Sequence, residues 1–198
     1  MKKRKSVPKH GASTYSKVGR IKIGKPIVEW GMFSDVPNGF QKIKLDIGCG
    51  RHPQPGFVGI DIQNFDDSRI IQHDIETYPW PLPDGCVSLA IASHIAEHIN
   101  PAKFGFINWM NEIWRVMEVE GKLMLALPYA GSPGYWQDPT HVNPCSENTW
   151  CYFDPLDPSK FYGFYRPKPW KIVSCAWDLQ GFMEVVLSKR RMDPSYEK

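Results

Sequence analysis

The stretch "KLDIGCG" (residues 44–50) is a short apolar run that ends in a Gly-x-Gly turn. Eleven residues after Gly50, a second apolar run, "FVGID", ends at Asp61. A strand that runs into a glycine turn lets the backbone approach a ligand where a Cβ atom would collide. A carboxylate at the end of the next strand can accept hydrogen bonds from a ribose. This pairing predicts a nucleoside-binding site at the carboxyl edge of a parallel sheet.

Charge is unevenly distributed along the 198 residues, although the hydrophobic (42%) and charged (23%) contents are typical of a soluble globular domain. Residues 1–28 hold nine Lys or Arg and no acid, which leaves 15 basic and 21 acidic side chains in the rest. A mildly acidic body argues against a dedicated nucleic-acid groove. Nucleic acid is therefore left open as a partner only through the basic N-terminus.

The five cysteines form no Cys-x-x-Cys pair and no finger-like Cys/His spacing. An odd number of cysteines without an apolar signal segment is typical of the reducing cytosol. No apolar run approaches the length needed to cross a bilayer. We therefore expect a cytoplasmic protein without a membrane partner.

Short apolar runs follow one another from residue 43 and predict the strands of a parallel sheet. They are "IKLDIGC" (43–49), "GFVGIDI" (56–62), "RIIQHDI" (69–75) and "VSLAIAS" (87–93). Asn100 and Pro101 are typical of a helix start, as cap and first helical residue. Apolar residues at three- and four-residue steps continue this helix over 101–117, and a buried strand follows at 122–127. Such a strand–helix–strand unit implies parallel strands joined by a right-handed crossover.

The chain beyond residue 128 changes character. Residues 128–169 are irregular and rich in Pro, Gly and aromatic residues, with one short helix predicted after Ser146. A loop region this long is typical of a lid or a substrate-binding wall. "WKIVSCAWD" and "FMEVVLSKR" follow with a short connection and predict an antiparallel hairpin.

Together these elements predict an α/β domain over residues 43–192. Its sheet would be Rossmann-like and mostly parallel, with a C-terminal antiparallel hairpin, in a three-layer α/β/α arrangement. Residues 1–42 lack a sustained period and are expected to form a basic tail and an irregular arm packed on the domain.

Five pieces of the sequence resemble a class I S-adenosylmethionine-dependent methyltransferase of the methyltransferase type 11 kind. The pieces are "LDIGCG", "VGID", "QHDI", "VSLAIASHIAEHI" and "NEIWRVMEVEGKLMLALP", in family order over about residues 43–128. The resemblance implies S-adenosyl-L-methionine as the cofactor. From the methionine part through the ribose to the adenine, the implied contacts are Asp46, Gly48, Gly50, Asp61, Ile62, Asp74 and Ile75. Ser93 and His94 would stand between cofactor and substrate. Taken singly, Asp46 could instead cap the glycine turn, and Asp74 could begin a loop.

The sequence departs from the family pattern at the first helix. The Gly-x-Gly spacing would put the third family glycine at His52, and the gap before "FVGID" is too short for the usual helix. "RHPQPG" resembles a loop that bypasses this helix, as in a truncated subset of the family. Arg51 or His52 could then cover the cofactor.

Histidines and acids gather in two segments, "SHIAEH" and "QDPTHV". If a helix starts in the first, His94, Glu97 and His98 share a face, which suits acid–base work or metal ligation. We predict His94 and His141 as catalytic groups, the alternative for each being a packed, hydrogen-bonded histidine. Asp138 would add a ligand for a metal, but the spacing matches no known family of sites and we predict no metal.

The predicted function is methyl transfer to an O or N atom of a small-molecule or sugar-like acceptor, with a histidine as base. One alternative is a nucleic-acid methyltransferase, although "SHIAEH" stands where the Asn/Asp-Pro-Pro-aromatic segment of that class is expected. Another is a nicotinamide-dependent oxidoreductase, which requires a third glycine where Pro53 stands. A third is a non-catalytic protein that binds the cofactor with the same fold.

Overall fold

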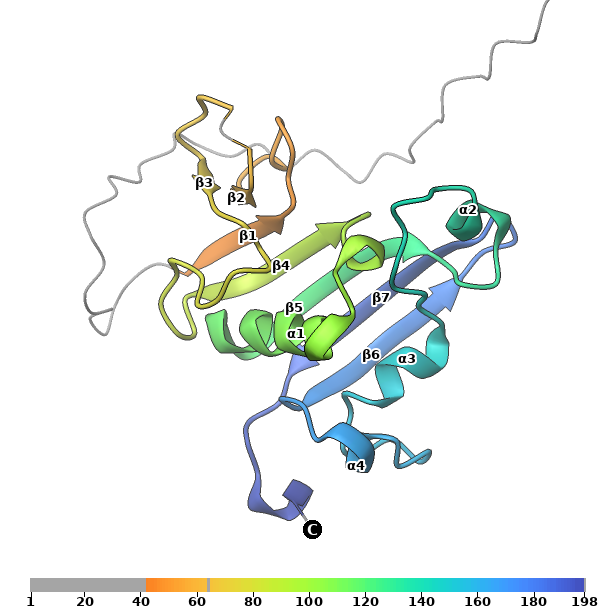
Figure 1. Cartoon of the computed structure of the whole chain (residues 1–198). Helices are drawn as coiled ribbons and strands as arrows, with labels where there is room; N and C mark the ends of the chain where they lie inside the picture. Colours follow the sequence, from red (N-terminus) through yellow and green to blue (C-terminus); the bar gives the residue numbers. More distant parts are fainter. Residues whose placement is uncertain (1–41, 64, 198) are drawn as a thin grey trace, which may run out of the picture.

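The computed structural model describes residues 42–63 and 65–197, which form a seven-stranded sheet with helices on one face (Figure 1). The strands are β1 (Ile43–Ile47), β2 (Val58–Asp61), β3 (Ile70–Gln72), β4 (Val87–Ser93), β5 (Met117–Pro128), β6 (Trp170–Trp177) and β7 (Phe182–Lys189). Their order is β3-β2-β1-β4-β5-β7-β6. Strands β1 to β5 are parallel, and β7 is antiparallel to both of its neighbours. The predicted Rossmann-like sheet with a C-terminal antiparallel hairpin is confirmed.

The strand order reverses at β1, which lies between β2 and β4. Its Leu45 is paired with Val58 on one side and with Ala90 on the other. The chain therefore builds one half of the sheet from β1 outwards and then returns to build the other half from β4. The carboxyl ends of the three strands meet at one edge, where ligands bind in open α/β sheets.

The hydrophobic core lies between the sheet and the helix α1 (Gly105–Val116). The apolar stripe of α1 buries Trp109, Met110 and Ile113 completely. Alternate residues of the strands, among them Leu45 and Leu123, meet this stripe with no exposed surface. The remaining α-helices of the described residues are short and follow β5, namely α2 (Pro133–Trp136), α3 (Glu147–Cys151) and α4 (Tyr162–Tyr165). The same residues also form three 3-10 turns, which are Ala96–His98, Ala102–Phe104 and Pro194–Glu197. No helix in the described part of the chain is long and apolar enough to cross a membrane.

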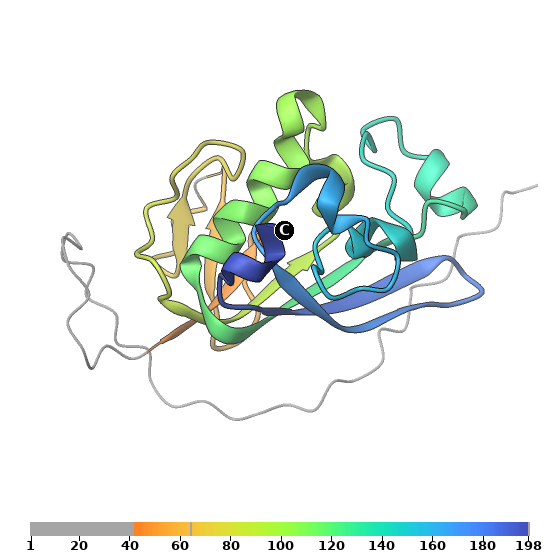
Figure 2. The same cartoon turned by 90° about the horizontal axis from the view of Figure 1, so that it is seen from below.

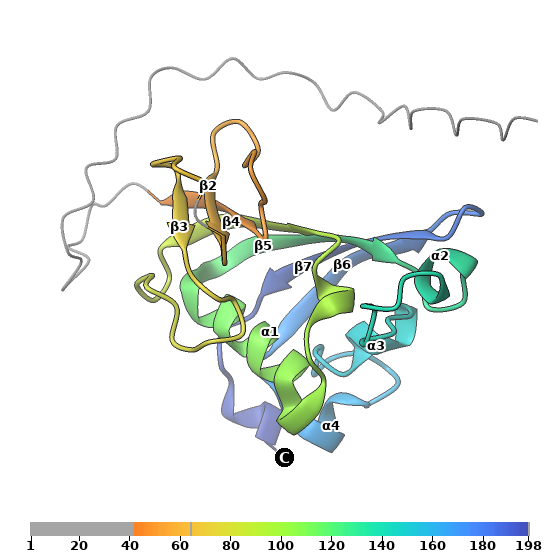
Figure 3. The same cartoon turned by 45° about the horizontal axis from the view of Figure 1, so that its top comes forward.

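Within the described residues the sheet carries one helical layer, not the two that the three-layer prediction requires. Helices α1, α3 and α4 lie on the same face (Figures 2 and 3). On the other face Met124 is 46% exposed, beside Ile91 and Val186 in the register of the sheet. The linkers explain the difference, because ten residues join β1 to β2 and eight join β2 to β3. Helical crossovers need about a dozen residues or more. The predicted bypass of the first helix is confirmed, whereas the predicted arm (residues 1–42) lies outside the described residues except for Lys42.

The predicted start of the long helix was wrong by four residues. Asn100 does cap a turn, because its Oδ1 accepts the Ala102 N–H at 2.9 Å, but that turn is a short 3-10 segment. Lys103 and Phe104 then take left-handed φ angles of 53° and 62°, which interrupt the helix. The helix resumes at Gly105. Position 105 requires glycine, because a Cβ atom there would overlap the carbonyl oxygen of Asn100.

The loop between β3 and β4 contains no helix and is held to α1 by a buried carboxylate. Glu112 Oε1 accepts hydrogen bonds from the Trp80 N–H and from Arg115 Nη2, both at 2.6 Å. The guanidinium also binds the Leu82 carbonyl and the exposed Asp84. This network therefore fixes the loop that leads from β3 back into the sheet.

Replacing Glu112 with Ala is expected to lower the free energy of unfolding by about 2 kcal/mol, measured by urea denaturation. The substitution leaves the Trp80 N–H without an acceptor and removes the buried partner of Arg115. The matched control is Asp84→Ala, which removes an 81%-exposed carboxylate from the same guanidinium. It should cost less than about 1 kcal/mol, and equal losses in the two variants would contradict the assigned role of Glu112.

Candidate active site

The glycine turn after β1 is tied directly to the acid at the end of β2. Gly50 N–H donates to Asp61 Oδ2 at 2.8 Å, and Gln63 N–H donates to Asp61 Oδ1 at 3.0 Å. Gly48 N–H donates to the Ile60 carbonyl at 2.8 Å. The two strands are therefore adjacent and the carboxylate faces the turn, as the sequence predicts.

The turn needs glycine for two different reasons. Both Gly48 and Gly50 have left-handed φ angles, 66° and 56°, which most side chains disfavour. A Cβ atom at Gly48 would overlap the side chain of Ile95. At Gly50, in contrast, no atom of the described residues beyond its two chain neighbours lies within 4 Å of the Cβ position. Gly50 thus presents bare backbone to open space beside a carboxylate, which is the arrangement that a nucleoside ligand requires.

Asp46 supports the loop that replaces the first helix. Its side chain is only 6% exposed, and its Oδ2 accepts the Gln54 N–H at 2.8 Å. Burial raises the pKa of Asp46, and the hydrogen bond from Gln54 partly opposes that rise. Asp46 thus fixes the loop after the glycine turn through Gln54 and not the turn itself, while its contact with a cofactor stays a prediction.

Asp74 and Ile75, predicted at the adenine, lie just after β3. The exposed Asp74 carboxylate accepts the Glu76 N–H at 2.9 Å and the Thr77 hydroxyl at 3.3 Å, which forms a turn. Ile75 is half-buried, and its carbonyl accepts the indole N–H of Trp80. Ile62, after β2, is 62% exposed. The contact of these residues with adenine therefore stays a prediction. Asp74 begins a loop, which was the alternative role left open for it.

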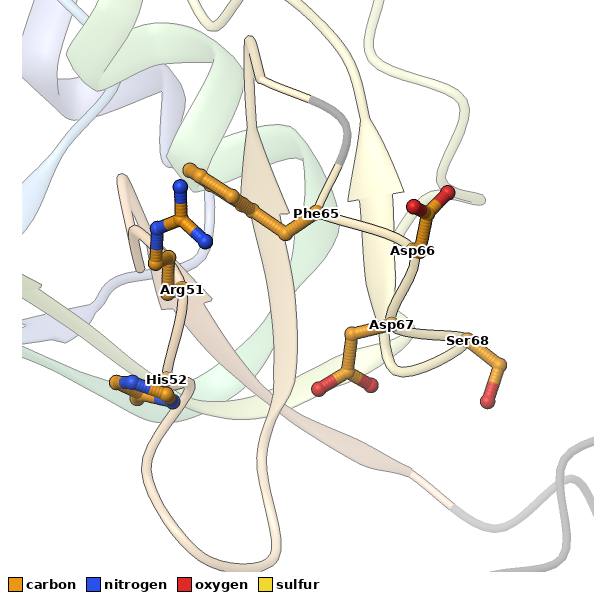
Figure 4. Close-up of a pocket in the computed structure, with 6 residues that line it drawn as sticks. All are labelled: Arg51, His52, Phe65, Asp66, Asp67 and Ser68. Carbon is orange, nitrogen blue, oxygen red and sulfur yellow. The ribbon is translucent and has the colours of Figure 1, made fainter.

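An open cleft of about 400 Å³ lies beside the glycine turn (Figure 4). Its walls are the segment after Gly50 and the segment after β2, through Arg51, His52, Phe65, Asp66, Asp67 and Ser68. The Arg51 guanidinium sits 5.2 Å from the centre of the Phe65 ring. Arg51 and His52, proposed from the sequence as a cover, thus do line a cleft. Phe65 was not predicted from the sequence as a site residue. The only hint in the sequence was its position as an aromatic residue four residues after Asp61, which ends β2.

Cys49 in the turn is not a candidate nucleophile. Burial, with the nearby Asp46 and Asp61, raises the pKa of its thiol to about 12. The reactive form of cysteine is the thiolate. This turn therefore contributes bare backbone beside the Asp61 carboxylate to the site, and no reactive sulfur.

Ser93 and His94 lie where β4 ends, on the other side of β1 from Asp61. His94 has a left-handed φ of 56°, and its N–H donates to the Ala126 carbonyl at 2.7 Å. Its Nδ1 is 3.3 Å from Glu97 Oε1, and this carboxylate raises the pKa of His94. Strained backbone of this kind concentrates at functional sites. His94 is 45% exposed, so its ring is accessible to a ligand.

The second candidate base, His141, reaches the same carboxylate from the loop after α2. Its Nε2 is 4.0 Å from Glu97 Oε1, and its Nδ1 is 2.7 Å from the Tyr135 carbonyl oxygen. The side chain is 9% exposed, so His141 is packed and hydrogen-bonded, as its alternative anticipated. The structure therefore brings His94 and His141 together around Glu97, and their catalytic roles stay predictions.

The same fold occurs in solved structures of other proteins. No model of a protein family matches the sequence, and no curated protein matches it. A SAM-dependent methyltransferase from Archaeoglobus fulgidus superposes with a TM-score of 0.52 at 18% identity, over 75% of this chain and 86% of that one. The N-methyltransferase NodS from Bradyrhizobium japonicum, solved with S-adenosyl-L-homocysteine, gives 0.52 at 11% identity, over 76% and 79%. The [4+2]-cyclase SpnF gives 0.50 at 14% identity, over 76% of each chain. The chain has the class I methyltransferase fold, and the cyclase shows that this fold does not by itself decide the reaction.

Proposed function

We propose that this chain binds S-adenosyl-L-methionine and transfers its methyl group to an oxygen or nitrogen atom of a small-molecule acceptor. One observation carries the proposal. The Asp61 carboxylate is hydrogen-bonded to the amide of Gly50 across the carboxyl ends of two neighbouring parallel strands. This pair lies beside the point where the strand order reverses, where nucleotide ligands of such sheets bind.

The residues at this edge suit the cofactor. Each oxygen of Asp61 accepts one backbone N–H, and a carboxylate has about four acceptor positions, which leaves room for ribose hydroxyls. Gly50 leaves open space for close backbone approach. The cleft between Arg51 and Phe65 adds a cationic and an aromatic wall beside them.

The bound sulfonium supplies an activated methyl group, so the protein mainly has to hold the acceptor in line with it. Such positioning contributes on the order of several kcal/mol to the barrier reduction. Ser93 and His94 project at the end of the strand on the other side of β1 and suit this task. With Nδ1 of His94 facing Glu97, its Nε2 is the atom available to receive an acceptor proton.

A two-stage experiment tests the proposal. The purified chain is first titrated with S-adenosylhomocysteine and, separately, with NAD⁺ by calorimetry, and we expect binding of the first only. It is then incubated with methyl-tritiated S-adenosylmethionine and a cell extract divided into small molecules, nucleic acids and proteins. We expect label in the small-molecule fraction. Label in nucleic acid would favour the alternative acceptor, and binding without any transfer would leave a cofactor-binding protein.

Gly50→Ala is expected to weaken S-adenosylhomocysteine binding about tenfold, equivalent to ~1.4 kcal/mol, because the methyl group enters the open space beside Asp61. The matched control is Gly85→Ala. Gly85 has a similar φ of 65°, and the nearest atom to its Cβ position is 3.9 Å away. Both variants should lose about 1 kcal/mol of stability from the left-handed backbone. A similar loss of binding in both would show that backbone strain alone explains the effect.

A further inference from the structure

Three side chains converge on one point near the carboxyl edge of the sheet. Glu97 and His98 belong to the 3-10 turn Ala96–His98 that follows β4, and His141 comes from the loop after α2. One carboxylate oxygen and one nitrogen from each ring lie within 4.8 Å of one another. We propose that Glu97, His98 and His141 form a binding site for a divalent transition-metal ion of the zinc type. The inference goes beyond the proposed function and does not depend on it.

The hydrogen bonds of the two rings leave the right nitrogens free. His141 Nδ1 lies 2.7 Å from the Tyr135 carbonyl oxygen, which can only accept, so this nitrogen carries the proton. Its Nε2 therefore keeps the lone pair that a metal needs. Protein ligands to metals commonly have this arrangement, with the second ring nitrogen fixed by a carbonyl or carboxylate.

His98 is fixed in the same way through Thr140. Its Nδ1 lies 3.3 Å from the Thr140 carbonyl oxygen and 3.1 Å from the Thr140 hydroxyl. That hydroxyl donates its own proton to Asp138 Oδ1 at 2.7 Å. The hydroxyl oxygen is thus an acceptor for His98, and His98 Nδ1 carries the proton. The Nε2 atom of each ring therefore keeps a lone pair, and one ring nitrogen of each histidine lies close to Glu97.

Glu97 is the strongest independent indication of a ligand. The residue is completely buried, and neither carboxylate oxygen has a hydrogen-bond partner among the described residues. Burying an unpaired carboxylate costs several kcal/mol unless a cation or donors compensate. A divalent ion beside two imidazoles would supply that compensation. The nearest competing group is His94, whose Nδ1 is 3.3 Å from Oε1 and forms an ion pair with it when His94 is protonated.

The backbone holds these ligands in place from both sides. The Glu97 carbonyl accepts the N–H groups of Val142 and Asn143 at 2.9 and 3.0 Å. The Asn143 side chain also donates to the Ala96 carbonyl at 3.0 Å. The two segments that carry the ligands are therefore joined whether or not a metal is bound. Ligand atoms around a tetrahedral zinc ion lie about 3.3 Å apart, so side-chain rotations that shorten the separations from at most 4.8 Å to this distance would complete the site.

The donor set selects the class of ion. Two imidazole nitrogens and one carboxylate suit zinc and its neighbours, whereas magnesium and calcium prefer oxygen ligands. Three protein ligands would also leave a coordination position for water or a substrate atom. Bound metal would in addition fasten the loop after α2 to the turn after β4, beside His94.

The test uses the full chain, stripped with a chelator and titrated with Zn²⁺ in competition with a chromophoric chelator, in the absence of S-adenosylmethionine. We expect one tightly bound ion per chain and a melting temperature that rises with Zn²⁺ concentration. Glu97→Gln, His98→Ala and His141→Ala should each weaken binding at least tenfold. The matched control is His73→Ala, which removes a half-buried, hydrogen-bonded histidine outside the cluster.

Cobalt substitution separates this site from binding by cysteine. The Co²⁺ protein should show d–d absorption without a thiolate charge-transfer band. A thiolate band, the absence of a stoichiometric ion, or binding unchanged in all three variants would overturn the proposal. If Glu97→Gln does not fold, the partly exposed His98 still gives the decisive variant. Because no cofactor is present, failure of this test leaves the methyltransferase proposal standing, and the reverse also holds.

Discussion

Asp61→Asn is expected to weaken the binding of S-adenosylhomocysteine at least 100-fold, equivalent to about 2.7 kcal/mol. Asn keeps the size of the side chain but loses the charge and replaces one acceptor with an N–H₂ donor. That donor must face either the Gly50 N–H or the Gln63 N–H, both of which now donate to the carboxylate. The remaining oxygen cannot serve both the backbone and a ribose. Titration calorimetry gives the affinity directly.

The matched control is Asp178→Asn in the β6–β7 hairpin. Asp178 Oδ1 accepts the backbone N–H groups of Gln180 and Phe182 at 2.9 and 3.0 Å, so it caps a turn in a similar way. It lies at the other end of the strand order. Asp178→Asn can keep its single amide oxygen toward both N–H groups, so it should lose little stability and no affinity, whereas Asp61→Asn should lose both. Unchanged binding in Asp61→Asn would remove the basis of the cofactor assignment.

Trp150→Ala should lower the free energy of unfolding by about 4 kcal/mol. Trp150 of α3 has no exposed surface, and its ring meets Phe106 of α1 edge-on at a centroid distance of 6.2 Å. Phe106 in turn contacts Phe153 at 5.9 Å. This cluster joins the region after β5 to the central helix. Truncation leaves a cavity at that junction, and urea denaturation measures the loss.

Two further variants test whether the loss comes from the buried position of Trp150 or from the removal of any tryptophan in this region. Trp136→Ala removes a tryptophan from the same region that is 72% exposed, and should cost less than about 1 kcal/mol. Trp150→Phe should recover much of the stability, because the indole N–H has no partner within the described residues. If Trp136→Ala were as destabilising as Trp150→Ala, the cluster would not be the main connection between α1 and the later helices.

The parts of the fold that were predictable depend on short-range patterns. Unbroken apolar runs located the strands, because strands that are covered on both faces have nearly continuous hydrophobic sequences. The bypassed first helix followed from the length of "RHPQPG". The start of α1 was not predictable, because it depends on the close approach of Gly105 to the Asn100 carbonyl. A second helical layer is absent from the described residues because the β2–β3 linker, like the β1–β2 linker, is too short for a helix.

In the candidate site, too, local contacts were predictable and long-range contacts were not. Gly50 and Asp61 are brought together by adjacent strands, so their spacing in the sequence was enough to predict the contact. The convergence of His98 and His141 spans 43 positions and depends on how the loop after α2 folds back. Complete burial of Glu97 could not be read from "SHIAEH", because burial of one acid depends on packing from distant segments.

The two halves of the sheet differ in how firmly they are anchored. β4, β5 and β7 supply many completely buried side chains. In contrast, β2 contributes only Ile60, and the three-residue edge strand β3 contributes none that is completely buried. Segments with few buried contacts open locally at lower free energy than the core. The half that carries Asp61 should therefore spend part of its time open, and a nucleoside would select the closed conformers. Apparent affinity is the intrinsic affinity multiplied by the closed fraction, so under the proposed function this thin edge favours rapid exchange of spent cofactor over tight retention.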